Sequence, residues 1–371
     1  MKRRFKRPIR WRRWILGLLL LAIGGFALTI SHTSACPPAV TADGPGSMRV
    51  IHYRCYGPST VLQLEYAARP ELEDDMLLVR VRAASVNPLD WHFMRGEPYI
   101  MRMQAGIGAP KDPRIGVDFS GTVEAVGKSV KNFKVGDEVF GGETGAFGQY
   151  LRVRENDAVV LKPANVEHAQ AAAIPIAATT ALQALRDQGH LKAGEKVLVN
   201  GASGGVGTFA VQIAKVMGAD VTGVCSARNV GLVASLGADR VLDYASIDFT
   251  AGNVRYDLIV DTVGNRDLRD LAKVLAPGGI AVMIAGTGRD PWIGPLSVPI
   301  KILAYKPFAD REFKFFVARL DPEDLGYLAG LMESGRMKAV IDQKYPLEKT
   351  GDAVAYVEAG HARGKVLIEM P

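Results

Sequence analysis

A cluster of glycines near the middle of the chain is the feature whose residue types and spacing most clearly indicate chemistry. Residues 196–210 place four glycines within seven positions, between an apolar run typical of a strand and a run typical of a helix. In that context Gly205-x-Gly207-x-x-Ala210 predicts a dinucleotide site, because glycines let the backbone approach a pyrophosphate and the helix N-terminus faces its charge. No Gly-Lys-Ser/Thr follows, which excludes a P-loop. We expect the pyrophosphate to contact Ser203, Gly204, Gly205, Val206 and Gly207.

The residues after the next expected strand, 220–225, indicate which dinucleotide binds. An NAD site places Asp or Glu there for the ribose 2′-hydroxyl, but here Ser226, Arg228 and Asn229 follow without an acid. A hydroxyl and a guanidinium suit the 2′-phosphate of NADPH, although a solvated surface charge is the alternative for Arg228. We therefore predict NADPH as the cofactor. Further cofactor contacts are expected from Tyr244, Val263 and Gly264.

The elements that must position this loop follow from hydrophobic periodicity. From Glu195 onward, short apolar strands alternate with helical segments, a pattern typical of a parallel sheet with helices on both faces. Before it, residues 76–165 contain short strands ended by glycines, which predicts a partly open β-barrel. Residues 169–185 are alanine-rich and are expected to be helical. The last run, residues 364–370, is expected to be a strand that returns to the first domain.

Six motifs in order give the chain a resemblance to a known family. They are residues 84–90 (ASVNPLD), 116–121 (GVDFSG), 135–140 (VGDEVF), the glycine-rich loop, 257–264 (DLIVDTVG) and Gly364-Lys-Val. From Met48 to Pro371 the chain resembles the medium-chain dehydrogenase/reductase superfamily, in particular its zinc-free quinone oxidoreductase branch (zeta-crystallin-like and reticulon-interacting-protein-like enzymes). The resemblance implies an α/β fold with two domains, commonly in a homodimer.

The domain division follows from the resemblance and the N-terminal composition. Residues 1–47 are a basic tip, a hydrophobic helix and a linker. Residues 48–168 begin a GroES-like, partly open β-barrel substrate domain. Residues 169–315 form a Rossmann domain with a doubly wound parallel sheet that binds NADPH, and residues 316–371 return to the substrate domain.

The same motifs bear on metals and on the acceptor. Zinc-dependent members of the superfamily have Cys-x-x-Asp and Gly-His-Glu where this chain has Asn87-Pro-Leu-Asp90 and Gly116-Val-Asp118. We therefore predict no metal. Hydride transfer to a plain ketone yields an alkoxide, whereas a quinone or enone yields a phenolate or enolate. The difference of about six pKa units is roughly 8 kcal/mol that no metal would supply, so the acceptor should delocalise the charge itself.

The resemblance also supplies catalytic candidates. Asn87 matches the asparagine that faces nicotinamide and substrate, and His92 takes the position of a tyrosine in several quinone reductases, which suits a proton donor or relay. Thr180 matches the threonine near the nicotinamide amide, and Tyr99 is expected to line the substrate pocket. The alternatives are an Asn-Pro turn, a half-buried histidine bonded to backbone and a helix-start hydroxyl. Lys365 could reach the cofactor, although a strand-edge lysine is the commoner case.

The N-terminus has a composition of its own. Residues 1–13 carry eight Lys or Arg and no acid, and the seventeen residues 14–30 carry no charge. This predicts a membrane-spanning or signal helix, followed by a Gly/Pro-rich linker. We expect membrane association through this single helix, with a bacterial-type inner membrane as the first choice; retention, cleavage and a mis-called start all stay open. Positive charges keep the tip in the cytoplasm and send the body across the membrane. NADPH, however, is a cytoplasmic molecule, so the side of the membrane on which the body lies also stays open.

Composition excludes two further classes. Without the eight basic residues of the tip, 37 basic residues face 39 acidic ones, so the body lacks the basic face that nucleic-acid binding requires. Cys36, Cys55 and Cys225 are few and widely spaced, which excludes a disulfide framework.

These observations predict a zinc-independent, NADPH-dependent reductase that transfers hydride to quinones or α,β-unsaturated carbonyls. One alternative is an NAD(P)-dependent alcohol/aldehyde dehydrogenase. Another is a non-catalytic NADPH-binding sensor or assembly factor at the membrane.

Overall fold

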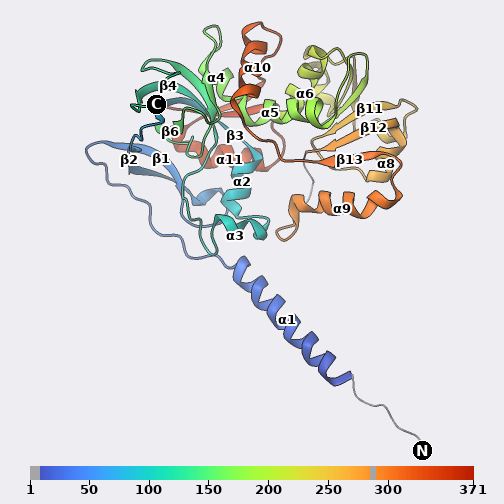
Figure 1. The fold of residues 1–371 in the computed structure, drawn as a ribbon, viewed down its shortest axis with the longest axis horizontal. Helices are drawn as coiled ribbons and strands as arrows, with labels where there is room; N and C mark the ends of the chain where they lie inside the picture. Colours follow the sequence, from blue (N-terminus) through green and yellow to red (C-terminus); the bar gives the residue numbers. More distant parts are fainter. Residues whose placement is uncertain (1–8, 285–289) are drawn as a thin grey trace, which may run out of the picture.

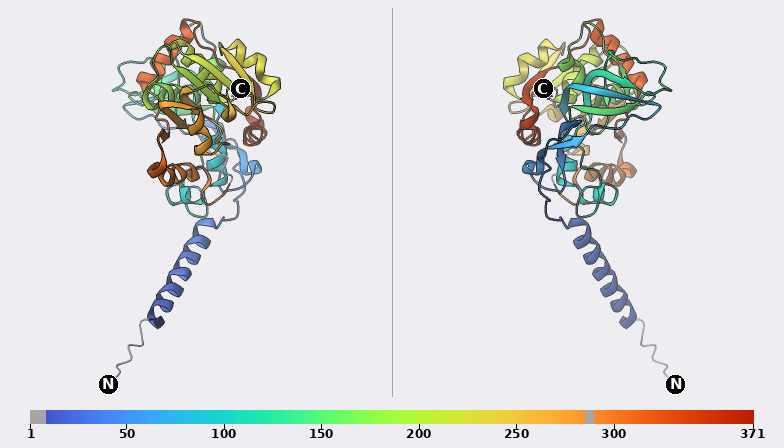
Figure 2. Two further views of the ribbon diagram at one scale, coloured as in Figure 1. Left: turned by 90° about the vertical axis from the view of Figure 1, so that its right-hand side faces the viewer. Right: turned by 90° about the vertical axis from the view of Figure 1, so that its left-hand side faces the viewer.

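The computed structural model of the chain describes residues 9–284 and 290–371. A body that contains two large sheets carries a long N-terminal helix, α1, which projects away from it (Figure 1, Figure 2). The first eight residues of the predicted basic tip lie outside the described part of the chain.

One of the sheets is mixed and forms the barrel side of the body. Its strand order is β14-β15-β3-β4-β5-β7, and β6 pairs with β3. Val79 and Val81 of β3 are buried while Arg80 and Arg82 between and after them are exposed, the alternation expected of a half-buried strand. Because β15 pairs antiparallel with β3, the last residues of the chain lie in this first sheet. The strands are β3 (Met76–Val86), β4 (Asp118–Val126), β5 (Glu138–Gly142), β6 (Tyr150–Arg154), β7 (Val159–Leu161), β14 (Ile341–Pro346) and β15 (Lys365–Glu369), with β1 (Ser47–Tyr53) and β2 (Leu62–Ala68) as a separate antiparallel pair.

The other sheet is parallel, with the order β10-β9-β8-β11-β12-β13. This is the strand order of a dinucleotide-binding doubly wound sheet, in which β8 is the first strand and the order reverses beside it. The strands are β8 (Lys196–Asn200), β9 (Asp220–Cys225), β10 (Arg240–Asp243), β11 (Tyr256–Asp261), β12 (Leu275–Met283) and β13 (Glu312–Phe315). The helices of this part are α6 (Gly205–Val216), α7 (Val230–Ser235), α8 (Leu268–Val274) and α9 (Ser297–Tyr305).

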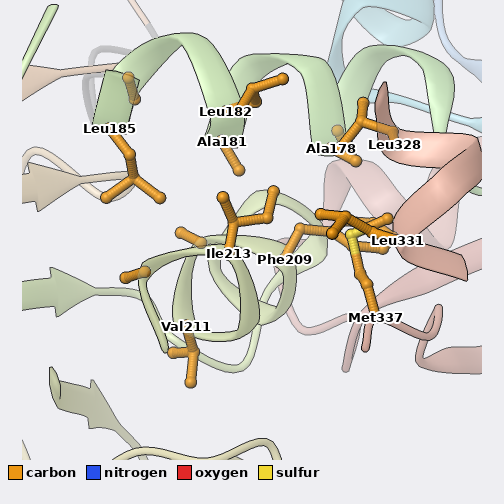
Figure 3. Close-up of a cluster of buried hydrophobic side chains, with 14 of the residues drawn as sticks. Ala178, Ala181, Leu182, Leu185, Phe209, Val211, Ile213, Leu328, Leu331 and Met337 are labelled. Carbon is orange, nitrogen blue, oxygen red and sulfur yellow. The ribbon is translucent and has the colours of Figure 1, made fainter. Parts of the chain in front are cut away.

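A shared hydrophobic core joins the two sheets. Ala178, Ala181 and Leu182 pack across Phe209 and Ile213 of α6, as Figure 3 shows. Leu328, Leu331 and Met337 close the cluster from α10 (Pro322–Glu333) and the turn after it. The same cluster includes side chains from strands of both sheets, so the two parts of the body are packed together without a solvent layer.

The helix expected over residues 169–185 is divided. α4 (His168–Ala172) ends before Pro175, which begins α5 (Pro175–Gln183), and a π-helical turn Ala184–Gln188 follows. Proline has no N–H to donate within a helix and its ring clashes with the preceding turn, so it begins a helix rather than continuing one.

The segment after Val86 forms α2 (Pro88–Arg95), which starts with a capping box. Asn87 is the N-cap, Pro88 takes the first helical position, and the Asp90 carboxylate accepts a hydrogen bond from the Asn87 backbone N–H. The helix ends at Gly96, whose φ of 61° lies in the left-handed region that glycine adopts freely. α3 (Arg102–Ala105) follows, and α11 (Thr350–Glu358) packs against α2.

The N-terminal helix α1 (Ile9–Ser31) is longer than the uncharged run that predicts it. Its window Trp14–Ser31 has a mean hydropathy of 2.2 and is long and apolar enough to cross a membrane, a test that signal sequences also pass. The cysteines form no framework of several disulfides in the described part of the chain, but one bond is present, between Cys36 and Cys55, which the sequence analysis did not predict. The linker turns back onto the body and brings the two cysteines together, a proximity that spacing along the chain does not reveal.

Candidate active site

The glycine-rich loop connects β8 to α6 at the carboxyl end of the parallel sheet. Gly201 has a φ of +83°, and a Cβ on Gly207 would lie 2.0 Å from the Gly201 carbonyl oxygen. Only glycine permits this close approach of the turn to the helix. α6 begins at Gly205, so its first backbone N–H groups, which have no partner within the helix, point out of this turn.

The loop is also tied to the last strand of the chain. The Gly364 N–H donates to the Ser203 carbonyl oxygen over 2.9 Å, and Gly204 forms a parallel bridge with Gly364. A Cβ on Gly205 would lie 3.4 Å from Cδ of Lys365. The loop therefore lies where the parallel sheet meets the barrel sheet.

Ser203, Ser226 and Asn229 come together at the expected adenosine end. The buried Asn229 side chain donates from Nδ2 to Ser203 Oγ (3.0 Å) and to Ser226 Oγ (3.2 Å). Its Oδ1 is buried and has no partner in the described part of the chain. An acceptor buried without a donor is costly, and of the ribose substituents of NADPH only a hydroxyl could donate to it. The residues present thus fit an adenosine dinucleotide.

Arg228 and Tyr244 lie at the exposed rim of this group. Arg228 Nη2 donates to the carbonyl oxygen of His361 over 3.3 Å, and the Tyr244 side chain is exposed. A guanidinium at an exposed rim can bind a phosphate by a charge-assisted hydrogen bond. The position of Arg228 is therefore compatible with its predicted role at the 2′-phosphate.

The turn after β11 is organised by a buried carboxylate. Asp261 Oδ1 accepts from the N–H groups of Val263 (2.9 Å) and Gly264 (2.8 Å) and from Nδ2 of Asn200 (2.9 Å). Burial raises the pKa of Asp261. Since their N–H groups are engaged, Val263 and Gly264 can meet a cofactor only through other atoms.

Asn87 lies in a buried network on the barrel side of the body, with partners from β3, β4, β15 and α5. Its Oδ1 accepts from Nζ of Lys365 (2.6 Å), and its Nδ2 donates to Asp118 Oδ2 (2.9 Å). Lys365 Nζ lies 3.4 Å from the same Asp118 oxygen, and Asp118 also accepts from Ser85 Oγ and from the Ile176 N–H. The Asn87 amide is thus held between an ammonium and a carboxylate.

The strand-edge interpretation of Lys365 was wrong. β15 lies between β14 and β3, so it is an interior strand, and Lys365 is 3% exposed. Burial lowers the pKa of this ammonium and Asp118 opposes the shift, whereas burial raises the pKa of the nearby Asp90 to about 7. The sequence signal was present in the Gly364-Lys-Val motif, but its partners come from two distant segments.

His92 is half-buried on α2. Its Nδ1 donates to the carbonyl oxygen of Glu97 over 2.9 Å, which leaves Nε2 as the unprotonated nitrogen of the neutral ring. Burial lowers the pKa of His92. The neutral ring therefore presents an acceptor, and the predicted role as donor requires the ring to take up a proton first.

The other two candidates lie in different surroundings. Thr180 is buried in α5 and its hydroxyl donates to the Ile176 carbonyl oxygen over 2.7 Å, so its oxygen can still accept a hydrogen bond. Tyr99 lies in a 3₁₀ turn, where its ring packs under the Arg102 guanidinium and edge-on to Trp292. Its ring is thus placed beside the end of α1.

The parallel sheet, its glycine-rich loop and the buried Lys365–Asn87–Asp118 network beside that loop define an NAD(P)H-dependent oxidoreductase with two domains. The chain belongs to the medium-chain dehydrogenase/reductase superfamily: residues 73–164 match the family described as alcohol dehydrogenase GroES-like domain, and residues 236–368 the family described as zinc-binding dehydrogenase. It is 34% identical to a chloroplastic quinone-oxidoreductase homolog of Spinacia oleracea, over 87% of this chain and 98% of that protein.

Two further comparisons support this placement. The chain is 32% identical to a chloroplastic NADPH-dependent alkenal/one oxidoreductase of Arabidopsis thaliana, over 91% of this chain and 84% of that protein. The solved structure of the quinone oxidoreductase from Coxiella burnetii aligns with a TM-score of 0.76 and 28% identity, over 88% of this chain and 100% of that one. The cofactor is NADP(H).

The zinc named in one family description is not matched by a ligand set here. Across residues 9–284 and 290–371, no three His, Cys, Asp or Glu side chains gather as metal ligands do. The position beside Asp118 and Asn87 holds the Lys365 ammonium. Independence from zinc remains a prediction, which the Lys365 cation supports.

Proposed function

We propose that the protein reduces quinones or α,β-unsaturated carbonyl compounds with NADPH and without a metal. The observation that carries this proposal is the Lys365–Asn87–Asp118 network. It places one fixed ammonium beside the Gly-rich loop, with the Asp118 carboxylate 3.4 Å from the Lys365 Nζ. Such a site stabilises a delocalised phenolate or enolate, whereas an alkoxide would need the stronger field of a metal.

In this mechanism NADPH, when bound, supplies the hydride. The residues of the chain bind the cofactor and orient the acceptor. Backbone N–H groups of Ser203–Gly207 would hold the pyrophosphate, and Asn229, Ser226 and Arg228 would bind the adenosine end. The Thr180 oxygen, which is free to accept, would take a hydrogen bond from the carboxamide. Asn87, fixed by Lys365 and Asp118, limits how the acceptor can lie, and protonated His92 returns a proton to the reduced product.

The test is NADPH oxidation by the full-length chain with a naphthoquinone, cyclohexenone and cyclohexanone, each with and without a chelator. We expect turnover of the first two only, with no effect of the chelator. Chelator-sensitive reduction of cyclohexanone, or oxidation of cyclohexanol with NADP⁺, would instead indicate an alcohol dehydrogenase. Tight NADPH binding without turnover of any acceptor would indicate a sensor or assembly factor.

We also propose that α1 is a retained membrane anchor. Trp14 and most apolar residues up to Leu28 are exposed, as a lipid-facing helix requires. The end of the helix is held on the body, because Ile30 is buried and Arg102 donates to the carbonyl oxygens of residues 30–32. Removal of the helix as a signal would leave this buried guanidinium without those acceptors. The bacterial-type inner membrane and the homodimer stay predictions.

We propose that the body lies on the side of the membrane opposite the basic tip, and two features support this proposal. The eight basic residues keep the tip cytoplasmic, and the Cys36–Cys55 bond persists only in an oxidising compartment. NADPH would then arrive bound to a chain exported in its folded state. Thiol alkylation in intact cells tests this, because reduced Cys36 and Cys55 would place the body in the cytoplasm.

A further inference from the structure

Exposed apolar side chains gather where α1 joins the body. Ile100, Met103 and Ile107 come from the segment that contains α3, and Trp292, Ile300 and Leu303 come from α9 and the turn before it. Ile300 is 58% exposed and Leu303 is 73% exposed. We call these six residues the apolar face. Large exposed apolar surfaces on a soluble body commonly mark a site of contact with another molecule or a membrane.

The two segments of the apolar face adjoin each other. The Tyr99 N–H donates to the carbonyl oxygen of Pro291 over 2.7 Å, and the Tyr99 ring lies edge-on to Trp292 with centroids 4.9 Å apart. Figure 1 and Figure 2 show α3 and α9 at the end of the body from which α1 projects. One side of the molecule therefore carries the apolar face and the start of α1 together.

Arg102 fixes the end of α1 within this face. Its Nη1 donates to the carbonyl oxygens of Ile30 (3.2 Å), Ser31 (3.1 Å) and His32 (2.9 Å), the acceptors that a helix C-terminus leaves unpaired. Beyond the helix, the Ser34 N–H donates to the carbonyl oxygen of Gly108 over 2.8 Å. Met103 and Ile107 adjoin these two attachments in sequence, so the position of α1 determines the position of the face.

The length of α1 and the charges beside the apolar face indicate which partner covers that face. The window Trp14–Ser31 has 18 residues, about 27 Å of helix, which nearly equals a hydrocarbon core of about 30 Å. When it spans the bilayer, Ser31 lies at the interface, and so does the apolar face. Residues 99–111 and 291–309 contain no Asp or Glu, and their exposed charges are Lys111, Lys301 and Lys306, a composition that favours an anionic lipid surface.

We propose that the apolar face is a second membrane contact, which enters the headgroup and outer acyl region of the leaflet that α1 leaves. This inference rests on the proposed anchoring by α1. The body then lies against the bilayer instead of swinging on a linker. α2 connects Asn87, its N-cap, to Gly96, whose carbonyl oxygen accepts from Arg102 Nε, so one helix about 12 Å long joins the catalytic network to the residue that holds α1.

The experiment uses the full-length chain with Leu303→Cys carrying an environment-sensitive fluorophore, in phosphatidylcholine vesicles with and without phosphatidylglycerol. The matched control is Val135→Cys, an exposed apolar position in the turn between β4 and β5. We expect a blue shift and quenching by lipids with a nitroxide near the headgroup at position 303, stronger with phosphatidylglycerol, and neither at 135.

Three outcomes overturn the inference in different ways. A chain that does not float with the vesicles removes the anchoring proposal and this inference together. A chain that floats while the label at 303 stays in water removes only the apolar face as a membrane contact. A blue shift that needs no vesicles and grows with protein concentration would show that a second copy of the chain covers the face. As a further check, Ile300→Asp with Leu303→Asp should keep flotation but lose the phosphatidylglycerol dependence.

Discussion

At the scale of single residues, the site depends on a lysine whose partners are far away in sequence. Lys365→Met would leave Asp118 buried without its cation, and breaking a buried pair in this way costs about 3–5 kcal/mol. We expect urea unfolding to show that loss, and we expect kcat to fall because Asn87 loses the donor at its Oδ1. Adding Asp118→Asn should recover part of the stability. The control is Lys344→Met, at an exposed lysine on the neighbouring strand β14, which should change neither the stability nor kcat. Equal losses in the single and double variants would contradict a pairing of the two charges.

Arg228 is the residue that should separate the two nicotinamide cofactors. Arg228 is exposed and lies between Ser226 and Asn229 in the chain, and a charge-assisted hydrogen bond is worth about 1.5–3 kcal/mol. Arg228→Ala should therefore weaken NADPH binding by about 10–150-fold and leave NADH binding nearly unchanged. Calorimetric titration with both cofactors measures this, and equal losses for the two would remove Arg228 from the 2′-phosphate.

His92 predicts a pH dependence of the rate. Burial lowers the pKa of His92 below its usual value of about 6.5, and only the protonated ring can donate. As pH rises through that lowered pKa the donor is lost, so kcat should be highest on the acid side and fall toward neutral pH. His92→Gln should have a lower kcat without this fall. The same acidic limb in the variant would assign the titration to another group, such as Asp90.

At the scale of elements, the junction of β8 and α6 requires a residue without a Cβ at position 207. A Cβ on Gly207 would meet the Gly201 carbonyl oxygen at 2.0 Å, so Gly207→Ala should displace the first turn of α6 and abolish NADPH binding. Gly231→Ala is the matched control, since a Cβ there meets nothing within 4 Å and lies in helix α7, where alanine gains about 0.5–1 kcal/mol. Thermal unfolding and cofactor titration of both variants test the contrast; normal NADPH binding by Gly207→Ala would contradict it.

The elements also show what the sequence could and could not predict. The strand-loop-helix around Gly201–Gly207 follows from local spacing, because turn, helix start and pyrophosphate contact all lie within fifteen residues. The division of residues 169–185 also has a local signal, since Pro175 favours the first position of a new helix. The burial of Lys365 and the contacts of Arg102 depend on segments that meet only in the folded chain, so no local pattern contained them.

At the scale of the whole molecule, the N-terminal segment is joined to the body by Arg102 and by the Cys36–Cys55 bond. The bond closes a loop of 19 residues, and a loop of that size restricts the unfolded chain by about 3 kcal/mol. We expect a reducing agent to lower the unfolding temperature of the full-length chain to that of the Cys55→Ser variant. The unfolding temperature of the variant itself should not change when the reducing agent is added.

Counting reactive thiols tests the Cys36–Cys55 bond without a measurement of stability. The denatured, unreduced chain should show one reactive thiol, from the buried Cys225, and the reduced chain three. Cys225→Ala is the control, because it removes the free thiol but should keep the shift on reduction. Three thiols before reduction, in protein prepared without reductant from its own compartment, would mean that the segment is held by Arg102 alone and would remove the argument that the body faces an oxidising compartment.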